Sequence, residues 1–133
     1  MLKTMIVLPD GKEISSGMAG AAITAATFTQ CVNDLEDLSL GSVCANLLEV
    51  ELLDKEQTLH LQQGDEIRLV KIGEDGHQYP MGFFTLEKPI RPTANTLRLT
   101  AYDRVTWLDK DLTEWLAGLQ EWPYSLHTFA RMV

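Results

Sequence analysis

The chain has 133 residues, of which 45% are hydrophobic and 23% are charged, which is typical of one globular domain, or of one domain and a fragment of the next. A formal net charge of −8 opposes contact with a phosphate backbone, so we expect no nucleic-acid partner. The sequence has no apolar run of about 18 residues and no signal-peptide pattern near its start. We therefore expect no membrane insertion, and we expect the chain to be made in a cytoplasm.

The first half of the chain predicts strands separated by turns and loops. Residues 3–8 and 12–15 flank Pro9-Asp10-Gly11, a tight-turn signal that predicts a hairpin. Residues 17–22 are small and predict a loop, and residues 23–32, rich in Thr, Phe and Val, predict a strand. Residues 33–41 predict a loop or a short helical turn. Residues 47–53 fit a helix by composition, but we expect a strand because β-type segments flank them.

The second half begins with a clearer β pattern. Residues 57–62 predict a short strand or a connector. Three further strands are predicted at 66–72, 78–87 and 96–102, with turns at 73–76 and 89–95, and together they form an antiparallel meander. In the last strand Leu97, Leu99 and Ala101 alternate with Arg98 and Thr100, so one face is apolar.

After Tyr102 the apolar spacing changes to three and four residues, which predicts helices. The helical face consists of Val105, Leu108, Leu112, Trp115 and Leu119. One short helix is expected at 103–109 with Asp103 capping its first turn, a second from 112 with Asp111 as its N-cap, and a third after Ser125. The pattern continues up to Val133, so we expect this chain to be the N-terminal piece of a longer polypeptide.

The sequence contains no recognisable catalytic, phosphate-binding or metal-binding motif, and we expect no catalytic residue, metal or cofactor. His60, His77 and His127 are widely separated and predict independent surface side chains. Cys31 and Cys44 are expected to be buried free thiols, with a disulfide or redox pair as the alternative. A Cys44–histidine nucleophile pair would need an exposed thiol of lowered pKa, whereas the apolar neighbours of Cys44 favour burial.

Two alternatives remain open. Paired acids such as Glu49 and Glu51 could indicate a hydrolase, although they would share one solvent-exposed strand face. The tryptophans could bind sugars, but packing in a core or an interface is the expected role. The interface candidates are Trp107, Trp115, Leu119, Trp122 and Arg104.

Residues 81–110, MGFFTLEKPIRPTANTLRLTAYDRVTWLDK, resemble the N-terminal part of phage tail hub proteins, also called baseplate hub or tail-associated proteins. The resembling pattern is a Gly-Phe-Phe strand, a Pro- and Arg-containing turn, an alternating strand, Ala-Tyr-Asp-Arg and a Leu-Asp-Lys step. Residues 122–126, WPYSL, are similar to the helix start that follows in such proteins.

The resemblance implies a mainly β fold with C-terminal helices: an antiparallel β-barrel or rolled sandwich of the tail-tube type, with two or three short helices after residue 103. It divides the chain into a barrel-like hub domain at 1–102 and a helical segment at 103–133 that leads toward a downstream domain. It implies a non-enzymatic part of a virion tail that assembles with copies of itself, as a ring that is commonly a trimer, and with other tail or baseplate proteins. The alternatives are a cell-wall carbohydrate-binding module and the N-terminal part of a tail-associated cell-wall hydrolase.

Overall fold

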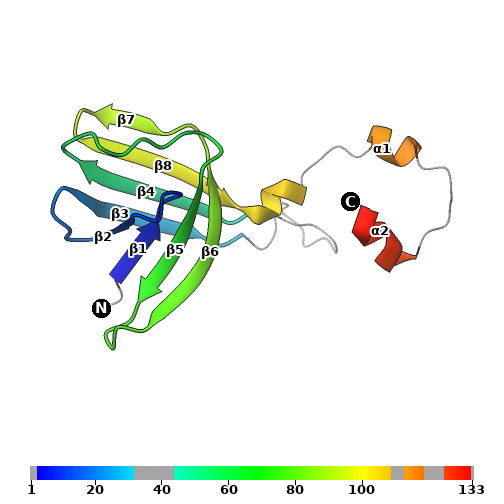
Figure 1. The fold of residues 1–133 in the computed structure, drawn as a ribbon, viewed down its shortest axis with the longest axis horizontal. Coiled ribbons are helices and arrows are strands. Elements are labelled where there is room, and N and C mark those ends of the chain that lie inside the picture. The colour runs from blue at the N-terminus through cyan, green and yellow to red at the C-terminus, as the bar shows by residue number, and fades with distance from the viewer. Residues whose placement is uncertain (1–2, 32–43, 109–112, 119–124, 133) are drawn as a thin grey trace.

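The computed structural model describes residues 3–31, 44–108, 113–118 and 125–132, and within them the chain is mainly antiparallel β-sheet (Figure 1). The strands are β1 (Lys3–Val7), β2 (Glu13–Ser15), β3 (Ala21–Thr29), β4 (Leu47–Asp54), β5 (Glu66–Ile72), β6 (Gln78–Leu86), β7 (Ile90–Thr93) and β8 (Thr96–Asp103). They are followed by a 3-10 helix, η1 (Arg104–Leu108), and by the short helices α1 (Thr113–Ala117) and α2 (Leu126–Met132). The predicted mainly β fold is confirmed.

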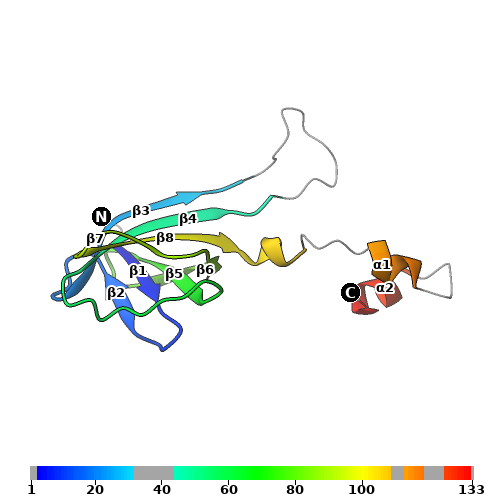
Figure 2. The ribbon, with the colours of Figure 1, turned by 90° about the horizontal axis from the view of Figure 1, so that it is seen from above.

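The strands form one rolled sheet in the order β2-β1-β5-β6-β8-β4-β3, with β7 paired to β8. Strand β6 joins the two layers, because residues 78–85 pair with β5 while Phe84, Thr85 and Leu86 pair with the end of β8. In Figure 2 the strands β3, β4 and β8 lie in one layer, with β1 and β2 below it. Strands β2 and β3 contact each other but form no ladder, so among the described residues the sheet is rolled and not closed into a barrel.

The core fills the inside of this roll. The alternation of β4 and β8 directs side chains of both strands inward, as the sequence predicts, while Glu49 and Arg98 face outward. Ile6, Ile14, Ile67 and Phe84 of the other layer complete the same cluster, along with Leu48, Val50, Leu52, Leu97, Leu99 and Ala101. Apolar burial of this kind is the main force that holds the two layers together.

The structure differs from the predicted elements in three places. Ala21 and Ala22 belong to β3 and not to a loop, because they pair with the end of β4 and are buried. The predicted turn at 89–95 contains β7, which pairs with β8. The four residues of β7 are exposed and include Pro92, so the composition of this segment is typical of a turn and does not indicate a strand. The expected helix at 103–109 is the 3-10 helix η1, so the described part of the chain after residue 103 contains less α-helix than expected.

Two predicted helix caps are present. The Asp103 carboxylate accepts a hydrogen bond from the Val105 amide at 3.1 Å. The Ser125 hydroxyl accepts one from the Thr128 amide at 3.1 Å, which confirms Ser125 as the N-cap of α2. The predicted cap at Asp111 and the predicted loop at 33–41 lie outside the described residues.

Cys31 and Cys44 form a disulfide, so the expectation of two free thiols is wrong. In the regular part of the β3–β4 ladder Thr29 pairs with Leu47, and continuing this register places Cys31 opposite Ala45, beside Cys44. The Cys31 amide also donates a hydrogen bond to the Asn46 side chain at 2.9 Å. The two strands are thus linked just beyond Thr29 and Leu47, the last pair of their ladder.

Asp54, at the end of β4, is fully buried and anchors the loop that follows it. Its carboxylate accepts hydrogen bonds from the amides of Thr58 and Leu59 at 3.0 and 3.3 Å and forms an ion pair with Arg91 at 2.8 Å. Arg91 also donates to the Leu59 carbonyl at 3.0 Å. Burial tends to raise the pKa of Asp54, but the hydrogen bonds and the charge of Arg91 outweigh it and hold the pKa below its ordinary value.

Candidate interaction surface

Strand β6 presents three large apolar side chains to solvent, and a bulge divides them between two faces. Leu69 of β5 pairs with Gly82 and Val70 pairs with Pro80, so Met81 is the extra residue. Gly82 adopts a φ of +135°, which side chains rarely tolerate. Beyond the bulge Phe83 lies opposite Arg68, whereas Tyr79 lies opposite Lys71 on the other face.

On the outer face Phe83 belongs to a group that we call the Arg104 cluster: Glu66, Phe83, Arg104 and Trp107. Arg104 begins η1 directly after β8, and its guanidinium carbon lies 4.3 Å from the centre of the Phe83 ring and 5.2 Å from that of Trp107. Its Nε and Nη2 donate to the two carboxylate oxygens of Glu66 at 2.9 and 2.7 Å. A two-bond fork of this kind restrains the orientation of the guanidinium, which lies close to both rings.

The electrostatics of the cluster follow from this fork. The hydrogen bond from Arg104 lowers the pKa of Glu66 below its ordinary value, and the positive charge of Arg104 acts in the same direction against partial burial. The side chains of Arg104 and Glu66 remain 50% and 30% exposed, so solvent screens the pair. The arrangement therefore presents an ordered, partly apolar surface and not a reactive group.

Two of the predicted interface candidates meet in this cluster, namely Arg104 and Trp107, and Trp107 is 51% exposed. Trp115 lies in α1 and is half-buried. Leu119 and Trp122 lie outside the described residues. The sequence interpretation missed Phe83 and Glu66, although adjacent Phe83 and Phe84 in one strand already require that one of the two rings faces away from the core.

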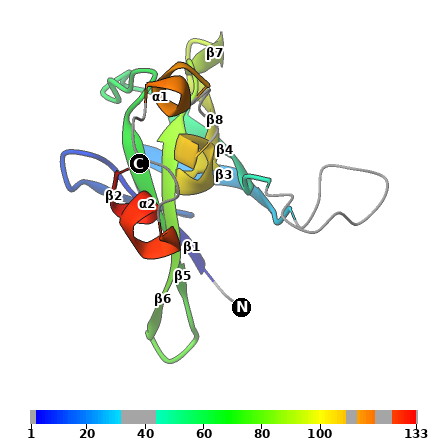
Figure 3. The ribbon, with the colours of Figure 1, turned by 90° about the vertical axis from the view of Figure 1, so that its right-hand side faces the viewer.

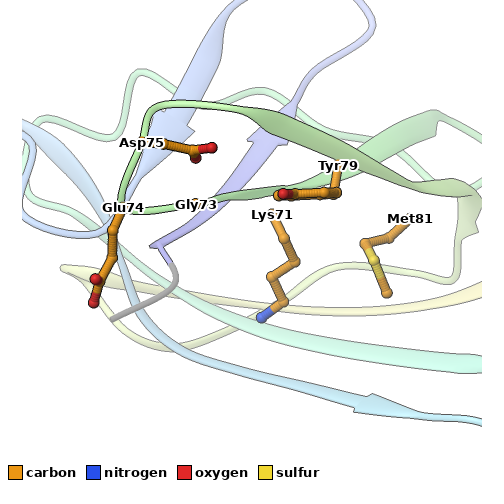
Figure 4. A pocket seen from close by; sticks show the side chains of 6 residues that line it. All are labelled: Lys71, Gly73, Glu74, Asp75, Tyr79 and Met81. Atoms are coloured by element: carbon orange, nitrogen blue, oxygen red, sulfur yellow. The ribbon is translucent and has the colours of Figure 1, made fainter.

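The inner face of the β5–β6 hairpin carries an open pocket of about 820 Å³, lined by Lys71, Gly73, Glu74, Asp75, Tyr79 and Met81. In Figure 4 the side chains of Lys71 and Met81 extend to the same side of the hairpin. Lys71 donates a hydrogen bond to the Thr4 hydroxyl at 2.8 Å, and Asp75 accepts one from the His77 amide at 3.0 Å. Lys71 therefore links the hairpin to β1 and Asp75 orders the hairpin turn, so these two hydrogen bonds do not converge on a shared point.

The other sequence candidates are dispersed. Glu49 and Glu51 share the outer face of β4, where Glu51 approaches Arg98 at 3.4 Å, so they do not face each other across a cleft. Cys44 is bonded to Cys31 in a disulfide, so it carries no free thiol for the nucleophile pair that its apolar neighbours already disfavoured. Within the described ranges no group of three or more His, Cys, Asp or Glu side chains could hold a metal ion. Nor does that part of the chain contain a helix long and apolar enough to cross a bilayer.

Comparison with known proteins adds no relative: no family model, no curated protein and no solved structure matches this chain.

Proposed function

We propose that this chain is a structural component of a phage tail or baseplate hub, where copies of it assemble as a ring at the distal end of the tail tube. The proposal starts from the resemblance of residues 81–110 to the hub family. The described part of that run, residues 81–108, comprises most of β6 together with β7, β8 and η1. We propose that the rolled sheet corresponds to the tail-tube-type barrel of such proteins.

The observation that carries the proposal is the Arg104 cluster at the junction between sheet and helices. Phe83 and Trp107 are 42% and 51% exposed, and both lie beside a guanidinium that Glu66 holds in place. Exposed aromatic rings around an ordered arginine are typical of protein contact sites, because they bury much area at a small entropic cost. We propose this surface as a contact between neighbouring copies, with a trimer as the expected ring, or with another tail protein.

The first experiment tests the tail assignment. Virions would be purified after prophage induction from the bacterium that encodes this chain, and their proteins identified by mass spectrometry. We expect the chain in tail fractions at a stoichiometry of a small ring, and electron microscopy of a deletion mutant should show tails that lack the distal complex. Normal, infectious virions without this protein would refute the proposal.

The second experiment tests the surface. F83A and W107A would be introduced singly into the phage, with Y79A as the matched control because Tyr79 is an equally exposed aromatic on the opposite face of β6. We expect F83A and W107A to reduce infectious titre and ring formation, while Y79A retains both. Equal effects of all three substitutions would exclude a specific contact at the Arg104 cluster.

The exposure of Trp107 also favours a second candidate, a module that binds cell-wall carbohydrate by aromatic stacking. The guanidinium of Arg104 already lies over the rings of Phe83 and Trp107, which leaves fewer ring faces for a sugar. Co-sedimentation with purified cell walls separates the two functions. Binding that W107A abolishes would support the carbohydrate module, and absence of binding would reject it. A third proposal is that this chain is the N-terminal part of a longer protein that is a tail-associated cell-wall hydrolase.

A further inference from the structure

Strand β3 borders the sheet, with β4 on one side and no strand on the other among the described residues. Its first residues are buried beside β1 and β2, whereas residues 24–27 and 29 are exposed. Figure 3 shows that β3 and the β5–β6 hairpin extend in different directions, so this part of β3 is not covered by the other layer. The outward backbone groups of residues 25–29 therefore have no described strand beside them.

This edge lacks the features that prevent strands from pairing with other molecules. Residues 21–31 contain no charged side chain and no proline, although 23% of the chain is charged. A bulge at Thr24 protects the start of the strand, but residues 25–29 continue in regular register with β4. Long, uncharged and regular edges are the ones that accept a further strand.

The side chains along the same edge leave the core partly open. Phe28 and Ala26 occupy the core-facing side of β3, because they pair with the buried Leu48 and Val50 of β4. Phe28 packs against the core and lies 5.9 Å from the Phe84 ring, yet it is only half-buried, and Ala26 is exposed. A strand added to β3 would cover both residues.

We propose that residues 25–29 of β3 pair antiparallel with the same residues of a second copy of this chain, about a two-fold axis at Thr27. In this register Thr27 faces Thr27, and Phe28 of each copy faces Ala26 of the other. A large side chain then lies against a small one on the core side, and threonines meet on the outer side, where such pairs are favourable. The proposal concerns the free protein and does not rest on the tail-hub function.

A second copy is the occupant that fits best, because its β3 is a comparable edge. The other borders of the sheet are less suitable: β2 has three residues and begins with Glu13, β7 contains Pro92, and the part of β6 that does not pair with β8 contains Pro80 and the bulge at Met81. The distribution of charge also permits this β3–β3 contact, although each copy has a net charge of −8. The outward-facing Glu49 side chains of the two copies would lie three strand spacings apart, about 14 Å. That distance exceeds the screening length of about 8 Å at physiological salt.

The contact is small, so a weak dimer is expected, with a dissociation constant of about micromolar or higher. A two-fold pair closes on itself and cannot repeat around a ring. It is therefore distinct from the ring contact proposed for the Arg104 cluster, and the two can fail separately.

Self-crosslinking tests the register. In T27C the two introduced cysteines would be directly opposite, with Cα atoms about 4.5–5.5 Å apart, which is within reach of a disulfide. The matched control is T29C on the same strand, whose cysteines would lie four residues apart along the pair, about 14 Å. Under mild oxidation we expect a covalent dimer of T27C, in which non-reducing peptide maps show a bond between the two introduced cysteines, and little or no dimer of T29C. Equal crosslinking of both variants, or of neither, would overturn the register.

Sedimentation of the 133-residue chain over a concentration series tests the contact itself. T27K places like charges against each other in the pair, so we expect its dissociation constant to rise at least tenfold over that of the unmodified chain. S16K adds the same charge at an exposed turn residue outside the edge and should leave the constant unchanged. A monomer at all concentrations, or an oligomer that T27K does not weaken, would refute the β3 pair, whereas a ring sensitive only to F83A and W107A would still support the tail proposal.

Discussion

Asp54 is the residue whose surroundings most clearly determine an energetic outcome. D54A would leave Arg91 and the amides of Thr58 and Leu59 without their shared acceptor inside the protein. Because the Arg91 side chain is 32% exposed, water would solvate part of its charge in D54A, which limits the cost of losing the ion pair. We expect the free energy of unfolding to fall by about 2–4 kcal/mol. Urea denaturation measures the change.

The control for D54A is E51A, which removes the exposed pair with Arg98 and should cost less than about 1 kcal/mol. A loss from D54A no larger than that from E51A would mean that the buried ion pair does not hold the loop after β4.

The same carboxylate gives a prediction about pH. The pKa of Asp54 in the folded protein is lower than in the unfolded chain, so its contribution to stability is present above the ordinary carboxyl pKa, about 3.9, and is lost as the pH falls through the folded value. We expect the stability difference between the unmodified chain and D54N to be largest near neutral pH and to shrink below about pH 4. Urea midpoints across this range measure it. A difference that is constant with pH would show that the Asp54 pKa is not lowered by folding.

At the scale of elements, strands with strict alternation, such as β4 and β8, were predictable because the polarity of each residue indicates which face of the sheet its side chain occupies. The disulfide was not, since it depends on a β3–β4 register that brings Cys31 beside Cys44. The Arg104 cluster was half predictable: Arg104 and Trp107 are close in sequence. Phe83 joins them because the bulge before Gly82 sets which β6 side chains face outward, and Glu66 joins them because the β5–β6 register places it opposite Thr85, beside the Arg68–Phe83 pair.

The disulfide makes a prediction for the β3–β4 hairpin. Its cysteines are 13 residues apart in sequence, and closing a loop of that size stabilises a fold by about 2–3 kcal/mol. We expect C31S/C44S to lower the melting temperature and to speed amide exchange at residues 25–31. The core strands β5 and β8 exchange through global unfolding, so their exchange should speed up only as far as the loss of global stability requires. Because the chain has only these two cysteines, reductant on the unmodified protein should reproduce the result. Unchanged exchange at residues 25–31 would show that the bond does not order the hairpin.

At the scale of the whole molecule, the net charge of −8 opposes every contact between copies. Added salt shortens the screening length from about 30 Å at 0.01 M to about 8 Å at 0.15 M. We therefore expect the β3 dimer to strengthen as salt rises, and sedimentation at the two salt concentrations measures this. Association that weakens with salt would point to a contact made by opposite charges instead of by an uncharged edge.

Strand β8 has a mechanical consequence. It pairs with β4 along residues 96–102 on one side and with β6 and β7 on the other, and the chain continues from its end into η1 (Figure 1). A pull transmitted through η1 acts along the strand, so the hydrogen bonds of both flanking ladders bear the load together and not one after another. A domain held from its C-terminal side would thus resist extension at its best-anchored strand.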